Sequence, residues 1–109
     1  MKKAFLIIIT IGLFIACSSQ SPKDVARNYA ENIAKGDIWE AKKYVTEQTE
    51  ELLLSMVKTT IIEVNPDFKF NFVKDSIAGD KAWVTYTDQN GIEGTIPLIK
   101  TNGKWKVHF

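Results

Sequence analysis

The chain has 109 residues, and its 14 Lys and Arg nearly balance its 13 Asp and Glu. A charge balance this even gives no basic excess of the kind that attracts nucleic acid. The chain has one cysteine and one histidine, which excludes an internal disulfide and any metal site built on two histidines. The length is that of a single domain.

The first sixteen residues have the layout of a secretory signal. Lys2 and Lys3 precede a mostly apolar run, residues 4–16, which ends at the small residue Ala16. As a helix this run would extend about 20 Å, short of the roughly 30 Å hydrocarbon core of a bilayer. We therefore expect residues 1–16 to be a cleaved signal peptide and not a membrane-spanning helix.

The stretch Phe14-Ile15-Ala16-Cys17 resembles the lipobox of bacterial lipoproteins. In that family the signal is cut just before the cysteine, and the cysteine sulfur, a good nucleophile as its thiolate, carries a diacylglyceryl group. The resemblance implies cleavage between Ala16 and Cys17, lipidation of Cys17, and a position in the bacterial envelope. Ser18 after the cysteine favours the outer membrane, with the protein facing the periplasm. The other interpretation is an unused cysteine in an ordinary signal peptide.

Residues 17–20 would then be the lipidated cysteine and a short tether, and residues 21–109 one domain that opens with helices. Ser21 and Pro22 are typical of a helix start, and Gly36 of a helix end. Asp37 and Glu40 form a capping box for a short second helix that ends near Thr46. A third helix is predicted over residues 47–62. Its apolar stripe consists of Leu52, Leu53, Met56, Val57, Thr60 and Ile61.

After Pro66 the spacing of apolar residues changes from the helical period to alternation, which predicts a four-stranded antiparallel meander. The first strand would carry the alternating residues Phe68, Phe70 and Phe72. The predicted turns are Gly79-Asp80, Asn90-Gly91 and Asn102-Gly103.

Hairpin registers follow from which side chains share a face. A two-residue turn at Asn102-Gly103 pairs Ile96 with Phe109, Leu98 with Val107 and Lys100 with Trp105. Pro97 would then lie opposite His108, where pairing should bulge or end. For the preceding hairpin we favour the three-residue loop 89–91. It places Ala82, Val84 and Tyr86 on the apolar face, whereas a two-residue turn would place Trp83, Thr85 and Thr87 there.

Four segments in this order resemble one known group of proteins. They are Ser21-Pro22-Lys23-Asp24-Val25-Ala26, Lys35-Gly36-Asp37-Ile38-Trp39-Glu40-Ala41-Lys42-Lys43-Tyr44, Gly79-Asp80-Lys81-Ala82-Trp83-Val84 and Asn102-Gly103-Lys104-Trp105-Lys106-Val107. They are similar to small bacterial lipoproteins with a domain of unknown function in the nuclear transport factor 2-like (cystatin-like) superfamily. The resemblance implies an α+β fold: three N-terminal helices on a curved four-stranded antiparallel sheet, forming a cone that can hold a pocket. Members of the superfamily include isomerases, dehydratases, transport factors and domains without a reaction, so the fold leaves the function open.

Few residues in the sequence suggest a catalytic or ligand-binding role. His108 alternates with Val107 and Phe109, which predicts a surface histidine, the other interpretation being a general base that faces a pocket. No metal site and no cofactor motif is visible. The candidate pocket-lining residues are the aromatic side chains with polar tips, namely Tyr29, Trp39, Tyr44 and Tyr86. The lysines near one end of the sheet, which are Lys81, Lys100, Lys104 and Lys106, are expected to keep its edge soluble, with weak contact to anionic headgroups or glycan as the alternative.

Three functional hypotheses follow. The favoured one is a non-catalytic envelope lipoprotein that binds a partner protein or a small apolar ligand. The second is a small lyase or isomerase that uses Tyr86 with His108 or an acid near the cone mouth. The third is a structural role in envelope assembly, which predicts an exposed apolar patch around Trp83 and Ile99.

Overall fold

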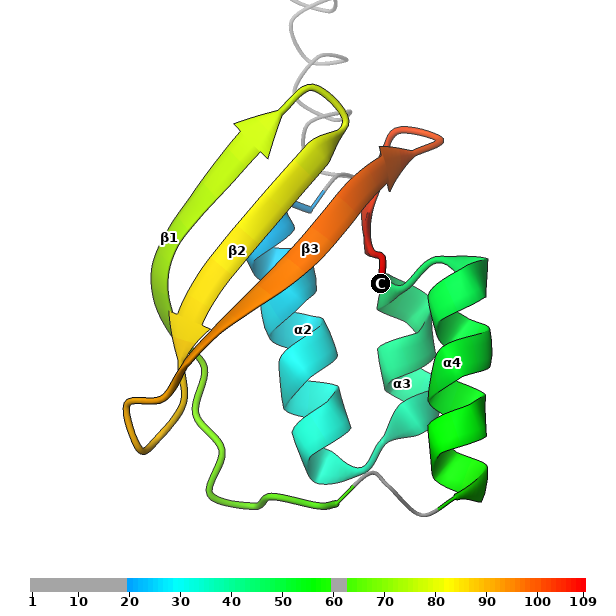
Figure 1. Cartoon of the computed structure of the whole chain (residues 1–109), viewed down its shortest axis with the longest axis vertical. Helices are drawn as coiled ribbons and strands as arrows, with labels where there is room; N and C mark the ends of the chain where they lie inside the picture. The colour runs from blue at the N-terminus through cyan, green and yellow to red at the C-terminus, as the bar shows by residue number, and fades with distance from the viewer. Residues whose placement is uncertain (1–19, 60–62) are drawn as a thin grey trace, which may run out of the picture.

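The computed structural model describes residues 20–59 and 63–109, and Figure 1 shows helices followed by an antiparallel sheet. The predicted signal peptide, Ala16, Cys17 and most of the tether lie outside the described residues, as do Thr60 and Ile61. Within the described part the fold is α+β, with three α-helices and one four-stranded sheet, as predicted. None of the described helices is long and apolar enough to cross a membrane.

Helix α2 (Pro22–Lys35) begins and ends as its sequence predicts. The Ser21 side chain accepts a hydrogen bond from the Asp24 N–H, and Pro22 occupies the first turn, where no N–H is needed. Gly36 closes the helix in the left-handed conformation, with φ 79°. The buried face carries Val25, Ala26, Ala30 and Ala34, and this face packs against the sheet.

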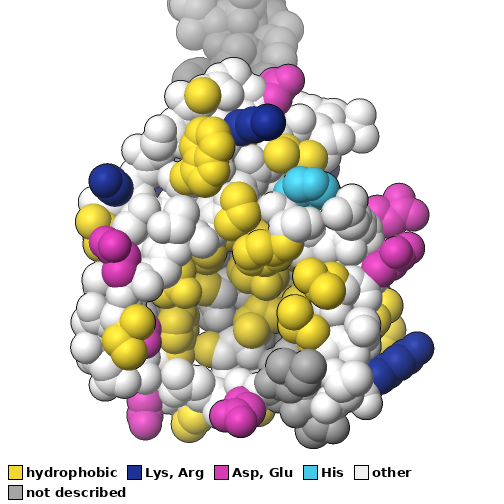
Figure 2. Space-filling model, viewed as in Figure 1, with side chains coloured by type: hydrophobic (Ala, Val, Ile, Leu, Met, Phe, Trp, Pro, Cys, Tyr) yellow, Lys and Arg dark blue, Asp and Glu magenta, His cyan; other side chains and the backbone are white. Residues whose placement is uncertain are grey.

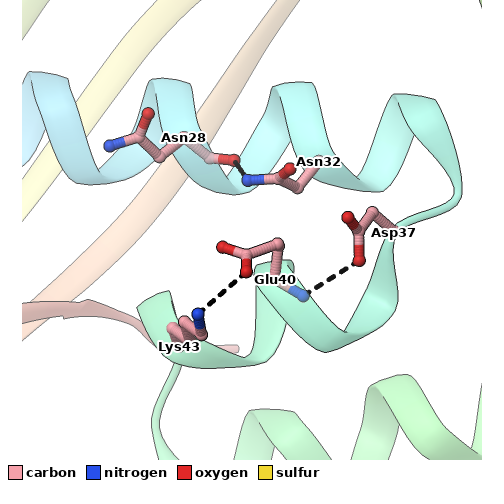
Figure 3. Close-up of polar contacts among 5 residues, drawn as sticks. All are labelled: Asn28, Asn32, Asp37, Glu40 and Lys43. Atoms are coloured by element: carbon pink, nitrogen blue, oxygen red, sulfur yellow. Dashed lines mark hydrogen bonds and ion pairs between the residues drawn. The ribbon is translucent and has the colours of Figure 1, made fainter.

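The second helical segment is split in two. Helix α3 (Ile38–Ala41) is capped by Asp37, whose Oδ1 accepts from the Glu40 N–H at 3.1 Å (Figure 3), and the 3₁₀ turn η1 (Lys42–Tyr44) follows it. Val45 is already extended and forms an isolated parallel bridge with Val107. The helical segment therefore ends at Tyr44, shortly before Thr46, because Val45 is extended and buried in the core beside the sheet.

Helix α4 (Glu47–Lys58) is shorter and less buried than predicted. The helix ends at Lys58, and Thr59 is its C-cap. The prediction that the helix continues to residue 62 is therefore wrong. Of the predicted apolar stripe, Leu53 is buried, whereas Leu52 is 43% and Val57 45% exposed. The physical reason is that α4 buries the side that carries Thr49 and Leu53, which leaves Leu52 and Val57 facing solvent.

The sheet has the order β1 (Asn71–Ala78), β2 (Lys81–Thr87), β3 (Glu93–Thr101), β4 (Lys104–Val107), all antiparallel. Ala82, Val84, Ile96, Leu98 and Val107 are buried on one face, and together with the apolar face of α2 they form the core. This is the inward face that the alternation predicted.

Both predicted hairpin registers are confirmed in their main features. Asp88 and Ile92 close the three-residue loop 89–91 through a 2.9 Å bond, which pairs Val84 with Ile96 as expected. In the last hairpin Leu98 pairs with Val107 and Lys100 with Trp105. Strand β4 ends there, as the proline predicted. The expected Ile96–Phe109 pair does not form, because the Phe109 N–H bonds to α4 instead.

The first strand begins later than the aromatic alternation suggested. It starts at Asn71, which pairs with Thr87 at the end of β2, so residues 68–70 have no strand to pair with. Phe68 and Phe70 are half-buried and pack against Tyr86 from this irregular segment. The prediction of a strand over residues 68–70 was therefore wrong.

Candidate ligand groove

An apolar groove of about 420 Å³ lies where the second half of α2 faces the sheet. Figure 2 shows apolar side chains gathered in a hollow near the centre of this face of the molecule. The groove is lined by Tyr29, Ala30, Ile33 and Ala34 of α2, by Glu63, Asn65 and Phe68, by Tyr86 of β2 and Gly94, Thr95 and Ile96 of β3, and by Phe109.

The segment of residues 63–68 closes one side of the groove because it is tied to the end of α2. The Asn65 N–H donates to the Ala34 carbonyl at 2.7 Å, and the Phe68 N–H donates to the Asn65 carbonyl at 3.1 Å. These bonds hold Phe68 against the wall and bring Glu63, which carries the groove's carboxylate, to its rim.

Aromatic rings stack along the wall. The Tyr86 ring lies 4.9 Å from that of Phe70 at an interplanar angle of 16°, and 6.1 Å from that of Phe68 in an edge arrangement. The Tyr29 ring lies 6.1 Å from that of Phe109. Such pairs contribute roughly 0.5–1.5 kcal/mol each beyond their buried area. The groove wall is therefore built from side chains that hold one another in place.

Gly94 lets the Tyr86 side chain lie flat on β3. A Cβ placed on Gly94 would come within 2.8 Å of the Tyr86 hydroxyl oxygen and 2.9 Å of two ring carbons. Because real Cβ atoms do not approach so closely, any side chain at position 94 would displace the Tyr86 ring. The glycine therefore sets the width of the groove at this point.

The two phenols of the groove are hydrogen-bond donors at neutral pH. Burial, with a smaller contribution from Tyr86, raises the pKa of Tyr29 to about 12. Burial and the Asp88 carboxylate raise the pKa of Tyr86. Both hydroxyls therefore keep their protons across the physiological range. They can donate to a polar atom of a ligand but cannot act as bases there.

The structure separates the four aromatic residues that the sequence singled out. Tyr29 and Tyr86 share the groove, whereas Tyr44 lines a different depression, near Trp105. Trp39 is 76% exposed, and the Lys42 ammonium lies 4.1 Å from the centre of its ring.

His108 is half-buried and turns toward the helices. Its Nδ1 lies 2.8 Å from the Oγ1 of Thr46, the N-cap of α4. His108 is thus partly exposed, as expected of a surface histidine, but it also contacts α4, because the chain beyond β4 packs against the start of that helix. His108 is not paired with Tyr86, since the groove is lined by Tyr86 and not by His108.

Sequence reasoning missed Phe68, Glu63 and Phe109 as groove residues. For Phe109 the sequence did hold a clue, because the predicted pairing with Ile96 had placed its side chain on the inward face of the sheet. Nothing local in the sequence indicated Glu63, because its position depends on the bond between Asn65 and Ala34. Among the described residues no group of three or more His, Cys, Asp or Glu side chains has a metal-binding arrangement.

The fold defined by these elements is that of the nuclear transport factor 2-like (NTF2-like) domains. The crystal structure of a protein from Campylobacter jejuni described as a "Putative NTF2-like transpeptidase" is similar to this chain. The similarity covers 83% of this chain and 99% of the Campylobacter jejuni chain, with a TM-score of 0.57 and 18% sequence identity. At this identity the similarity shows the fold alone. It confirms the NTF2-like fold that the sequence motifs indicated.

A family profile described as "Domain of unknown function (DUF4878)" matches residues 15–66, which include α2, α3 and α4. The comparison with curated proteins found no match. The chain therefore has an NTF2-like fold, and its residues 15–66 are similar to a domain of unknown function.

Proposed function

We propose that this protein is a lipid-anchored bacterial envelope protein whose cone-shaped domain binds a small apolar or amphipathic ligand, or an apolar side chain of a partner, without catalysing a reaction. The groove between α2, residues 63–68 and the sheet is the observation that supports this proposal. Its walls are mainly apolar and aromatic, and two protonated phenols can orient a bound molecule.

The chemistry available in the groove supports binding over catalysis. Proton-transfer catalysis requires a base within hydrogen-bond reach of the reacting group and a matching acid. Glu63 is the carboxylate in the groove wall, and it is exposed to solvent, whereas the polar tips of Tyr29 and Tyr86 stay protonated. The groove thus offers donors and apolar contact, which suit recognition.

A lyase, isomerase or transpeptidase activity is the alternative, the last suggested by the printed name of the Campylobacter jejuni structure. The aliphatic hydroxyl in the groove wall is that of Thr95, and its hydrogen-bond partner among the described residues is the hydroxyl of Thr85, with 3.4 Å between the two Oγ1 atoms. A second hydroxyl is not the general base that a nucleophile needs for activation. This alternative would gain support from a Glu63→Gln variant that binds a ligand normally but fails to convert it.

A role in envelope assembly would use the outer face of the sheet. Trp83 is 39% exposed there and lies opposite Pro97 on β3, with Ile99 two residues further along that strand. Loss of a partner on Trp83→Ala, with unchanged ligand binding in the groove, would favour this role.

Binding in the groove can be tested with an uncharged fluorescent naphthylamine such as N-phenyl-1-naphthylamine. We expect saturable binding to the wild type and about tenfold or greater weakening by Ile33→Glu, because a charge in the groove loses apolar contact and must be desolvated. Val57→Glu makes the same kind of change on the exposed face of α4 and serves as the matched control. Equal weakening by both variants, or no saturable binding to the wild type, would contradict the proposal.

The anchor has its own test. Radiolabelled palmitate supplied to cells should be incorporated into the wild type and not into Cys17→Ser. Mass spectrometry of the mature chain should find an acylated N-terminal Cys17. A chain free of acyl groups would remove the envelope anchor from the proposal and leave the groove untouched.

A further inference from the structure

A basic depression of about 310 Å³ lies at the end of the domain where the described chain begins. It is lined by Gln20, Val25, Lys43, Tyr44, Lys104, Trp105 and Lys106. It thus combines three lysines with the side chain of a tryptophan, and it includes the first described residue. No part of it belongs to the groove.

Contacts between the segments hold the lysines together. The Lys106 ammonium donates to the Lys43 carbonyl at 2.9 Å, which joins β4 to η1. A fourth lysine, Lys100, lies with its ammonium 5.6 Å from the centre of the Trp105 ring. The cluster is therefore formed by the fold and not by one flexible run of sequence.

The neighbouring acid neutralises little of this charge. Glu40 bonds to the Lys43 ammonium at 2.8 Å (Figure 3) and raises the pKa of that group. The Lys43 side chain nevertheless remains 64% exposed, so its ammonium can still meet an anion from solvent. The four lysines outnumber Glu40 and Asp80, the latter in the turn between β1 and β2, although the chain as a whole is nearly neutral.

The position of Gln20 connects this cluster to the proposed anchor. Gln20 follows Cys17 by three positions, with Ser18 and Ser19 between them, and three such steps span at most about 11 Å when fully extended. Figure 1 shows the turn between β1 and β2, the end of β3 and the start of α2 at this same end of the molecule. A lipid on Cys17 would therefore keep this end within reach of the bilayer, and contacts of the domain's own surface would then have to fix its orientation.

Building on the lipid anchor proposed above, we propose that the cluster of Lys43, Lys100, Lys104 and Lys106 docks onto anionic phospholipid headgroups and orients the domain. Each lysine close to such a surface strengthens attachment roughly fivefold, and tryptophan favours the same interfacial region. The groove includes Ile33 and Ala34 near the far end of α2, about 17 Å along the helix from its start. In this orientation the groove lies on the side of the domain (Figure 2), above the bilayer surface, and receives its ligand from the aqueous side.

The orientation can be measured on the full lipidated chain in vesicles. A fluorophore is placed on Asp80→Cys, at the basic end, or on Asn90→Cys, in the loop at the other end of β2, and energy transfer to a headgroup-labelled lipid is recorded. We expect stronger transfer from position 80 than from position 90 in phosphatidylcholine–phosphatidylglycerol vesicles. The difference should vanish in phosphatidylcholine alone or at high salt.

Charge reversal supplies the matched comparison. The triple variant Lys43→Glu, Lys104→Glu, Lys106→Glu should abolish the difference between the two positions. The control triple variant Lys58→Glu, Lys69→Glu, Lys74→Glu changes three exposed lysines elsewhere by the same charge and should preserve it. The salt dependence of the two labelled single-cysteine variants gives the same answer without charge reversal, should the triple variant fail to fold.

Equal transfer from both positions in anionic vesicles, while the chain still floats with the vesicles, would overturn the docking proposal and leave the anchor intact. A chain that does not float with vesicles at high salt would refute the anchor and, with it, this orientation. A difference that persists in phosphatidylcholine alone would also overturn the role of the lysines.

Discussion

The backbone N–H of Phe109 donates a hydrogen bond to Oγ1 of Thr49 at 2.9 Å, which ties the chain beyond β4 to the first turn of α4. Thr49 is fully buried, and its Oγ1 also accepts a bond from the Thr46 hydroxyl at 3.1 Å. The same contact sets the position of the Phe109 ring against Tyr29 in the wall of the groove. One buried hydroxyl thus links the helix, the sheet and the groove.

Replacing Thr49 by Val should lower the free energy of unfolding by about 1–3 kcal/mol, because a part-buried N–H loses its acceptor while the size of the side chain is kept. Thr49→Ser retains the hydroxyl and should cost less. Urea denaturation measures both, with Thr59→Val at the exposed end of α4 as the control. Equal stability of the Val and Ser variants would show that the bond to Phe109 contributes nothing.

Gly94→Ala should narrow the groove by displacing the Tyr86 ring, at a cost of about 1–3 kcal/mol for the forced overlap. If the overlap with Tyr86 is the cause, Tyr86→Ala should relieve it, so the two changes together should cost less than the sum of the single changes. A double-mutant cycle by urea denaturation measures this coupling. Strict additivity would mean that Gly94 is needed for another reason.

Local rules of sequence were sufficient wherever the determining contact lies within a few residues. Ser21 and Asp37 begin helices because their side chains cap the first turn, and Gly36 ends one because it adopts a left-handed conformation. The loop 89–91 follows from the need to bury Val84 opposite Ile96. In that loop the Asp88 carboxylate accepts from the N–H groups of Asn90 and Ile92, which makes the turn a local unit. Such features do not depend on the rest of the fold.

The failures concern contacts between distant segments. The apolar stripe of α4 showed that the helix is amphipathic but not that Leu52 and Val57 stay exposed. The alternation of Phe68 and Phe70 predicted a strand, but it could not show that these residues have no partner strand. The groove itself depends on the bonds that bring Asn65 to Ala34 and Phe109 to Thr49, and neither pair is close in sequence.

Tyr29 should make stability depend on pH in the alkaline range. Its pKa is raised from 10.0 to about 12, so the folded state holds a proton that the unfolded state has already lost. The stability that this provides is complete below pH 10 and is lost as the pH rises from 10 toward 12. Denaturation midpoints of the wild type should fall across this range, and those of Tyr29→Phe should fall less steeply. Parallel pH profiles for the two proteins would contradict the raised pKa.

Leu98 and Leu52 should respond very differently to truncation. Leu98 is 1% exposed at the centre of the sheet, so Leu98→Ala should cost about 2–5 kcal/mol through lost burial and the cavity that remains. Leu52 is 43% exposed on α4, so Leu52→Ala should change stability by about 0.5 kcal/mol or less. Chemical denaturation at several protein concentrations measures both. A large cost at Leu52 that rises with concentration would mean that a second copy of the chain covers the α4 face, since only an intermolecular contact makes stability depend on concentration.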